Sequence, residues 1–144
     1  MAMARQQQGR DGEVIRMLKE GMAAEKMSAR DYDLLIAAAD HQEEREWLMH
    51  IRNDEKRHYL LLEDIYQDLT GRDYPILRPP ASMPQEYCEM LKTSICDALE
   101  AAAFYEKLIN RLSCMRHQET VCGILNDEKE HARTLAALYQ RCPY

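Results

Sequence analysis

The sequence contains few of the residues that interrupt helices. Among its 144 residues are five glycines and five prolines, and four of the prolines lie in one short stretch, residues 75–84. Glycine and proline are the two least favourable residues inside a helix. The long segments on either side of that stretch are instead rich in Ala, Leu, Met, Glu, Lys and Arg. This composition predicts an all-α protein.

Other absences exclude whole classes of protein. No apolar run is long enough to span a bilayer, and the polar N-terminus lacks the apolar segment of a signal peptide. The net charge is −6, and no basic stripe offsets it, which argues against a nucleic-acid binder. We therefore expect a cytoplasmic protein without a membrane or nucleic-acid partner, and we expect residues 1–11 to be a disordered tail.

The cysteines give a further exclusion. There are five, an odd number, and no two of them form a C-x-x-C pair. This pattern fits neither a disulfide scaffold nor a zinc ribbon or rubredoxin-type iron centre. We expect all five to be reduced thiols.

One short motif occurs twice. The sequence NDEKRH occupies residues 53–58, and NDEKEH occupies residues 126–131. Each copy places a Glu three residues before a His, and residues three apart share one face of a helix. The two copies are 73 positions apart, and the same offset relates other pairs such as Tyr32 and Tyr105. The repeated unit is therefore a helical hairpin that occurs twice.

Apolar residues at steps of three and four predict four helices in one domain, residues 12–144. Their expected ranges are Gly12–Ala39, a second helix that follows an Asp40-x-x-Glu43 capping box and ends near Thr70, then Pro84–Leu112 and His117–Gln140. Short connections make two antiparallel hairpins, 12–70 and 84–141. The proline-rich segment 71–83 reaches about 40 Å when extended, enough to cross the length of a bundle.

The repeated Glu and His residues are candidate metal ligands: Glu55 and His58 in the first copy, Glu128 and His131 in the second. They interrupt stripes that are otherwise apolar, and burying them there is costly unless something pairs with them. A bound metal ion would offset that cost. Glu25 occupies a similar inward position on the first helix and adds a carboxylate.

These residues resemble the rubrerythrin and ferritin-like family of dinuclear carboxylate proteins. The matching features are Glu25 seven residues before Tyr32 and the two Asp-Glu-x-x-His motifs that begin at Asp54 and Asp127. The resemblance covers nearly everything from Val14 to Tyr139. It implies a ferritin-like four-helix bundle of two antiparallel hairpins joined by a long crossover. It also implies that Asp54 orients His131 and that Asp127 orients His58.

The chain departs from the family pattern at one position. The offset of 73 places a fourth carboxylate at residue 98, which is an alanine. Each helical step turns the side chain by about 100°, so Asp97 lies to one side of the inner stripe and Glu100 towards the opposite face. Asp97 is the expected substitute, helped if the third helix shifts register by a residue or contains a π-bulge. Otherwise the third helix contributes no ligand.

Three functions remain open at this point. By resemblance, the chain holds one or two iron ions, with manganese or zinc as alternatives, and reduces peroxide or oxygen or oxidises iron. Its electron donor is then an external protein. It could instead be a non-redox protein with an asymmetric or mononuclear site, or a bundle scaffold with a degenerate site. We expect a homodimer, and we expect His41, His50 and His117 at the surface or at helix ends.

Overall fold

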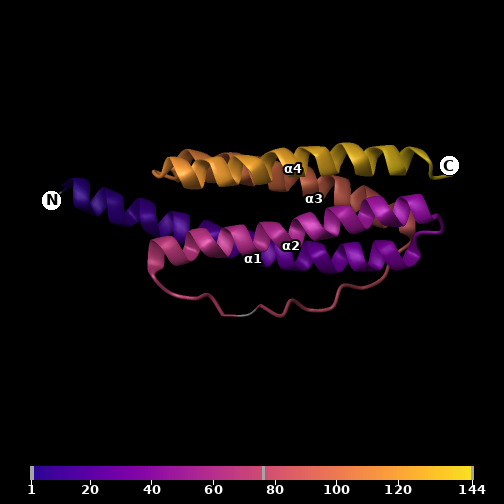
Figure 1. Cartoon of the computed structure of the whole chain (residues 1–144), viewed down its shortest axis with the longest axis horizontal. Coiled ribbons are helices and arrows are strands. Elements are labelled where there is room, and N and C mark those ends of the chain that lie inside the picture. The colour runs from indigo at the N-terminus through magenta and orange to yellow at the C-terminus, as the bar shows by residue number, and fades with distance from the viewer. Residues whose placement is uncertain (1, 76, 144) are drawn as a thin grey trace.

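The computed structural model describes residues 2–75 and 77–143, except the side chains of residues 3–8 and 10. It contains four helices and, over the described residues, no strand. Their bounds are α1 Ala2–Ala38, α2 Gln42–Thr70, α3 Tyr87–Arg111 and α4 Met115–Gln140. Figure 1 shows the α1–α2 hairpin packed against the α3–α4 hairpin, with the crossover running along the outside of α1 and α2. The predicted all-α bundle of two hairpins is confirmed.

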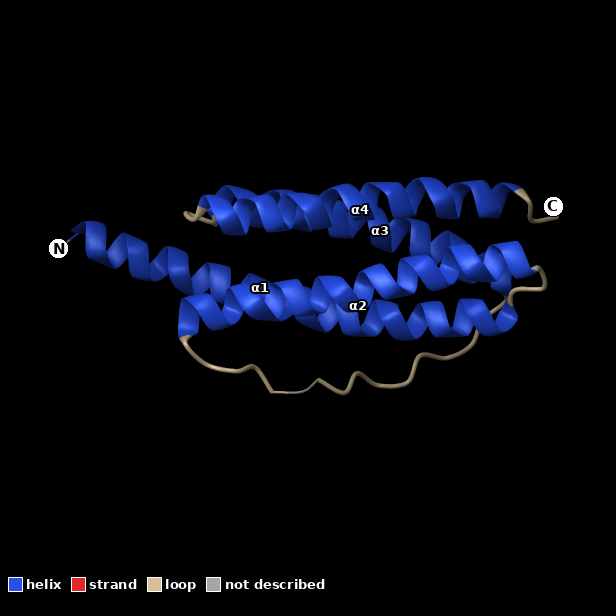
Figure 2. Ribbon diagram, in the orientation of Figure 1, coloured by secondary structure: helices blue, strands red, loops and turns tan. Residues whose placement is uncertain are grey.

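The first helix begins earlier than predicted. Residues 2–11 are helical, so the expected disordered tail is wrong over this range, and Met1 lies outside the described residues. Ala, Met, Arg and Gln, which make up most of this segment, are among the best helix formers. Figure 2 shows the segment projecting beyond the end of the bundle as a continuation of α1.

The ends of α2 and α3 are set by local interactions. The predicted capping box at Asp40 is wrong, because His41 is the N-cap of α2 and its side chain makes no capping hydrogen bond. Gly71 ends α2 in the left-handed region, at a φ of 68°, which glycine adopts without steric cost. The side chain of Glu86 starts α3 by accepting hydrogen bonds from the backbone N–H groups of Cys88 and Glu89, each 3.0 Å long.

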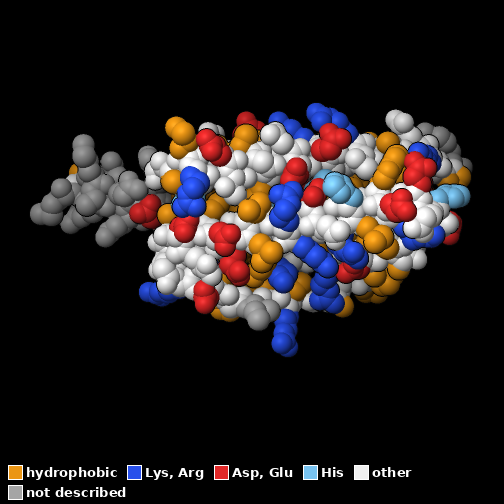
Figure 3. Space-filling model, in the orientation of Figure 1, with side chains coloured by type: hydrophobic (Ala, Val, Ile, Leu, Met, Phe, Trp, Pro, Cys, Tyr) orange, Lys and Arg blue, Asp and Glu red, His pale blue; other side chains and the backbone are white. Residues whose placement is uncertain are grey.

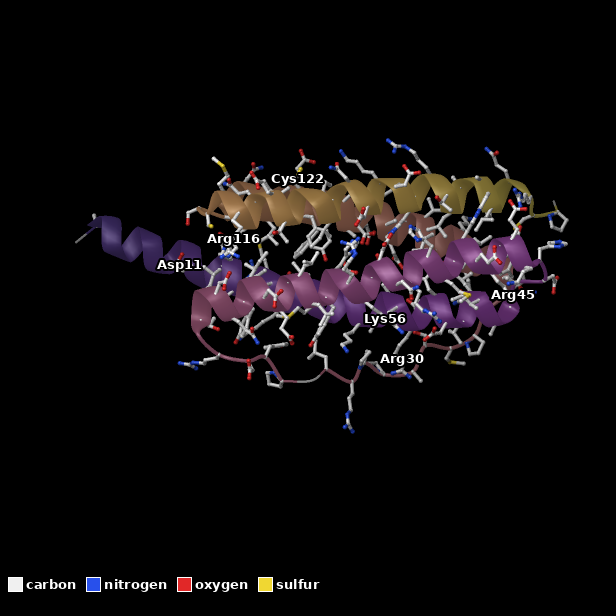
Figure 4. All side chains as sticks on the ribbon, in the orientation of Figure 1. Asp11, Arg30, Arg45, Lys56, Arg116 and Cys122 are labelled. Atoms are coloured by element: carbon white, nitrogen blue, oxygen red, sulfur yellow. A yellow bond between two sulfur atoms is a disulfide. The ribbon has the colours of Figure 1, made fainter. Side chains whose placement is uncertain are left out.

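The crossover, residues 71–86, is attached to α1 by side chains. The Arg30 guanidinium donates to the Pro79 carbonyl, and the Ser82 hydroxyl donates to Asp31. Figure 4 labels Arg30 beside the crossover. On the face that Figure 3 shows, acidic and basic side chains are interspersed. No helix of the described chain is long and apolar enough to cross a membrane.

Two apolar clusters fill the bundle, one towards each end. The first includes Leu18, Leu62, Leu108 and Val121, and the second includes Leu35, Leu48, Leu91 and Leu135. All eight are fully buried. The buried Glu and His residues of the repeated motif belong to neither cluster. The core is therefore apolar towards both ends and polar in a layer contributed by the motif helices.

A disulfide joins Cys88, near the start of α3, to Cys142, just after α4. The expectation of five reduced thiols is therefore wrong for these two cysteines, and Cys96, Cys114 and Cys122 are free. The two residues are 54 positions apart, and nothing in that spacing indicates pairing. They meet because the antiparallel α3–α4 hairpin brings its two ends together.

We predict that loss of this disulfide lowers the free energy of unfolding by about 2–4 kcal/mol, because the crosslink restricts the unfolded chain. The measurement is chemical denaturation of the oxidised protein and of a Cys88→Ser/Cys142→Ser variant. A Cys96→Ser/Cys122→Ser variant is the matched control, since both thiols are exposed. Equal unfolding midpoints for all three proteins would contradict the prediction.

Candidate metal centre

Three helices place four ligand groups around one point. Glu25 comes from α1, Glu55 and His58 from α2, and Glu128 from α4, and one ligand atom from each lies within 4.8 Å of all the others. His131, also from α4, joins them at its Nδ1 atom, 3.2 Å from a Glu55 oxygen and 3.5 Å from a Glu128 oxygen. All five residues are between 0 and 3% exposed. The repeated motif thus converges as its spacing predicted.

The Nε2 atom of each histidine forms a hydrogen bond with an aspartate of the other hairpin. His58 Nε2 lies 2.8 Å from Asp127, and His131 Nε2 lies 2.8 Å from Asp54. Because an ionised carboxylate only accepts hydrogen bonds, Nε2 carries the proton and Nδ1 faces the glutamates. The predicted crossed pairing of the aspartates and histidines is confirmed. It gives each ring the orientation of a metal ligand.

The inward-facing atoms lack hydrogen-bond partners. Within the described chain, one carboxylate oxygen of each glutamate and the Nδ1 atom of each histidine are buried without a partner; the atoms are Glu25 Oε2, Glu55 Oε1, Glu128 Oε1, His58 Nδ1 and His131 Nδ1. Buried polar atoms are seldom left in this state, because each costs free energy comparable to a lost hydrogen bond. Carboxylate oxygens and imidazole nitrogens are ligands for iron, manganese and zinc. The residues present therefore fit a metal site.

The two histidines have different numbers of carboxylates nearby. His58 Nδ1 has three carboxylates nearby, at 3.5 Å from Glu25, 3.5 Å from Glu55 and 3.3 Å from Glu128. His131 Nδ1 has only Glu55 and Glu128 within 4.0 Å among the described residues. Glu128 presents one oxygen to each histidine, and Glu55 approaches both with the same oxygen. Two adjacent ligand positions would thus share Glu55 and Glu128, and only the His58 position has a third carboxylate.

Charges in the cluster shift its pKa values strongly. Burial alone lowers the pKa of His58, but Glu128, Glu25 and Glu55 outweigh it and raise that pKa to about 12. His131 responds in the same way to Glu128 and Glu55, and its pKa rises to about 10. Burial also raises the pKa of Glu25 well above its ordinary value. Without a metal ion, protons therefore carry the positive charge of the cluster at neutral pH.

Tyr105 fixes the first-helix carboxylate. Its hydroxyl donates a hydrogen bond of 2.6 Å to Glu25 Oε1, the oxygen that lies 3.5 Å from His58 Nδ1, and Oε2 is buried without a hydrogen-bond partner. Gly21 lies one helical turn before Glu25, and a Cβ atom there would lie 3.5 Å from the Tyr105 hydroxyl and 3.1 Å from Leu62. A larger residue at this position would press on Leu62 and would contact the Tyr105 hydroxyl that holds Glu25.

A pocket of about 460 Å³ between α1 and α3 reaches the cluster from the surface. Glu25, Glu55 and Glu128 line its inner end together with Ala98 and Tyr32. The predicted inward position of Ala98 is confirmed, since this residue is 3% exposed. The pocket gives a small molecule a route to the polar layer.

Asp97 does not join the four-residue group. Its side chain is exposed and lines the same pocket with Glu100, which the sequence placed on the opposite face. The helix α3 is regular through this region and contains no π-bulge among its described residues. Ligation by Asp97 therefore stays a prediction.

The fold has known counterparts among solved structures. A hypothetical protein from Pyrococcus furiosus superposes with a TM-score of 0.78 at 20% sequence identity, covering 88% of each chain. A two-domain protein from Anabaena variabilis, which contains DJ-1/ThiJ/PfpI-like and ferritin-like domains, gives a TM-score of 0.70 at 15% identity. The superposition covers 90% of this chain and 36% of that protein. No known family profile matches the sequence, and no curated protein is significantly similar to it.

These similarities concern the fold. This is a ferritin-like four-helix bundle. Its metal-ligand geometry comes from the chain's own residues, because identities of 15–20% carry no information about activity.

Two polar contacts were not predicted from the sequence. Arg57 lies between the two orienting aspartates, with its Nη2 atom 2.7 Å from Asp127 and 3.4 Å from Asp54. His117 lies at the start of α4, a helix end as expected, but its side chain is buried and contacts Asp68 at 2.9 Å.

Proposed function

We propose that the buried cluster holds iron and that the chain is a rubrerythrin-like oxidoreductase, which reduces peroxide or dioxygen or oxidises iron. One observation carries the proposal. Five buried glutamates and histidines from three helices converge, and one buried atom of each makes no hydrogen bond within the described chain, although the histidines and glutamates approach to 3.2–3.5 Å. A purely structural cluster would be expected to satisfy these atoms internally.

The protein residues would hold the metal in a fixed geometry. Asp127 and Asp54 keep the protons of His58 and His131 on Nε2, so that both Nδ1 lone pairs point inward. Tyr105 holds Glu25 in place. The two apolar clusters restrict water on either side of the polar layer. These features preorganise the ligands and leave the pocket between α1 and α3 as the approach for a substrate.

Bound iron would supply the electrons that peroxide or dioxygen takes up. The electrons must be replaced from outside the chain, because the sequence has no rubredoxin-type cysteine pairs. We therefore include an external donor protein in the proposal. A homodimer and a cytoplasmic location are parts of the same proposal.

A non-redox metal protein is the second candidate, and the inequality of the site favours it. Glu25, Glu55, His58 and Glu128 form a complete group of four on their own. Four nitrogen and oxygen ligands satisfy zinc in a closed site. One tightly held ion beside His58, with the His131 position empty, would give a mononuclear protein.

Metal content distinguishes these functions. The protein is purified without oxygen from iron-supplied cells, and its iron and zinc are measured per chain. Two iron ions whose visible absorption is lost with a reductant and restored by peroxide would support the oxidoreductase. One ion, or zinc that resists exchange, would support the second candidate. A chain that takes up no metal under any loading condition would overturn both.

Metal binding is expected to strengthen as the pH rises. In the metal-free cluster the pKa is raised to about 12 for His58 and to about 10 for His131, so both rings are protonated at neutral pH. A metal ion must displace these protons, and we expect about two to be released when both rings become ligands. Between pH 6 and pH 8, the apparent affinity should rise by up to about 100-fold per pH unit.

The proton release can be counted by calorimetric titration in buffers of different ionisation enthalpy. A His41→Ala variant is the control, because the His41 side chain is exposed at the N-cap of α2 and makes no capping hydrogen bond. It should release as many protons as the unmodified chain. Affinity that stays constant between pH 6 and pH 8 would mean that the histidines are not ligands.

A further inference from the structure

The pocket between α1 and α3 leads to the position where the repeat lacks a carboxylate. Ala98 lines its inner end beside Glu55, Glu128 and Tyr32. Glu55 and Glu128 are the two carboxylates nearest His131. The pocket therefore reaches both carboxylates that serve the position short of one ligand.

The two hairpins are related closely enough to show what is missing. Glu25 and residue 98 are related by the offset of 73, and so are Tyr32 and Tyr105. Tyr105, from α3, donates its hydrogen bond to Glu25 on α1. The equivalent bond would run from Tyr32 on α1 to a carboxylate at residue 98 on α3. Ala98 has no such group, and no hydrogen bond to the Tyr32 hydroxyl is found within the described chain.

Charge at the site favours an added anion. If two divalent ions bind, as the proposed function requires, they would bring four positive charges, whereas Glu25, Glu55 and Glu128 of the cluster supply three negative ones. The histidines are neutral when they bind a metal. The surplus lies at the His131 position, because Glu25 approaches only His58. A single carboxylate would balance it.

The size and lining of the pocket indicate what kind of ligand body would fit behind the carboxylate. A volume of about 460 Å³ is far larger than peroxide or dioxygen requires and suits an organic molecule. Ala24, Ala101 and Phe104 give its walls an apolar surface. Acidic side chains stand nearer the surface; they are Glu20, Asp31, Asp97 and Glu100. They would repel a second negative charge at the outer end of the ligand.

We propose that this pocket binds an organic monocarboxylate with an apolar body, whose carboxylate takes the place of the missing glutamate beside Ala98. Tyr32 donates a hydrogen bond to that carboxylate, as Tyr105 does to Glu25. The inference rests on the proposed metal site, because the head group binds beside His131 only when a metal ion neutralises the glutamates there.

The test uses the full chain loaded with Co²⁺, whose visible absorption reports a change of ligands, and a calorimetric titration with hexanoate. We expect saturable binding that alters the Co²⁺ spectrum and is at least about tenfold weaker for hexanol, which lacks the head group. Adipate, which adds a second carboxylate at the far end, should also bind at least about tenfold more weakly. Metal-free protein should not bind hexanoate.

Variants locate the ligand within the pocket. Ala98→Glu should abolish hexanoate binding by supplying the carboxylate, and Ala98→Leu should abolish it by filling the space. Tyr32→Phe should weaken binding about tenfold and leave the amount of bound Co²⁺ unchanged. Tyr139→Phe is the control, since Tyr139 is a partly exposed residue near the end of α4 and does not line the pocket.

The results separate this inference from the metal site. If Co²⁺ binds but hexanoate leaves its spectrum unchanged, the carboxylate site is wrong and the metal site stands. The carboxylate site is equally wrong if hexanoate binds Ala98→Glu as tightly as the unmodified chain, or if adipate matches hexanoate. If Asp97→Asn loses Co²⁺, Asp97 is the fourth ligand and the inference fails. If no Co²⁺ binds, both proposals fail.

Discussion

Replacing Glu55 by glutamine is expected to remove metal binding from both ends of the cluster. One Glu55 oxygen lies 3.5 Å from His58 Nδ1 and 3.2 Å from His131 Nδ1, so this carboxylate serves both positions. Glutamine has nearly the same shape but no charge. Because a hydrogen-bond partner behind a metal ligand is alone typically worth 10–100-fold in affinity, loss of a shared ligand should cost about 100-fold or more.

The measurement is a competition titration with a chelator of known affinity, performed in parallel on Glu55→Gln, Glu25→Gln and Glu43→Gln. Glu25 approaches only His58, so its variant should weaken one position and spare the other. Glu43 is a solvent-exposed glutamate of the same helix as Glu55 and should have no effect. Equal losses for Glu25→Gln and Glu55→Gln would mean that a single ion binds to all four groups.

The Glu55→Gln substitution also tests whether the cluster is only structural. In the metal-free protein, Glu55 is a buried partner of two protonated histidines. Removing one member of such a group leaves uncompensated charge and usually destabilises a protein by several kcal/mol. A scaffold with a degenerate site would show this loss of stability and no metal binding before or after the change. A metal protein would lose both stability and bound metal.

The sequence predicted the parts of the molecule that depend on helical spacing. Residues three apart on a helix share a face, so Glu55 with His58 and Glu128 with His131 had to point the same way. The repeat at a fixed offset then required the two faces to meet in an antiparallel bundle. The crossed pairs of Asp54 with His131 and Asp127 with His58 followed from the family resemblance, and both distances are 2.8 Å.

Contacts between helices at their ends and edges were not predictable in the same way. Arg57 bridges Asp54 and Asp127, yet the second copy of the motif has Glu130 at the equivalent position, so the repeat gave no sign of it. The Cys88–Cys142 disulfide joins two helix ends that only the completed hairpin brings together. Such contacts depend on the rotation and length of each helix, which local sequence patterns determine only within a few residues.

The inexact symmetry of the chain extends to the ends of the bundle. Asp68 and Arg141 are related by the offset of 73, as are His117 and Glu44. At one end His117 contacts Asp68 at 2.9 Å, and at the other Arg141 lies 3.8 Å from Glu44. The two contacts occupy equivalent positions. The repeat exchanges α2 and α4, yet α2 supplies the acidic side chain at both ends of the bundle. Ala98 differs from this pattern, because there one partner is lost without replacement by another polar group.

Substituting glutamate for Ala98 is expected to restore the balance of the site. The pocket beside Ala98 can accept the longer side chain, and Tyr32 is placed to donate a hydrogen bond to it. The new carboxylate would give the His131 position a third oxygen ligand, matching the one that Glu25 gives His58. We expect the second metal ion to bind about 10–100-fold more tightly, and the number of ions retained after dialysis to approach two per chain.

The matched control is Ala98→Gln, which has the same shape without the charge and should leave the second affinity nearly unchanged. Adding Tyr32→Phe to Ala98→Glu should reduce the gain, because the new carboxylate loses the donor that corresponds to Tyr105 for Glu25. Metal content by mass spectrometry and affinity by competition titration report both effects. If Ala98→Glu binds no more metal than Ala98→Gln, residue 98 is not the vacant ligand position. Another side chain would then have to supply the third carboxylate of the His131 position, and Asp97 would be the first to test.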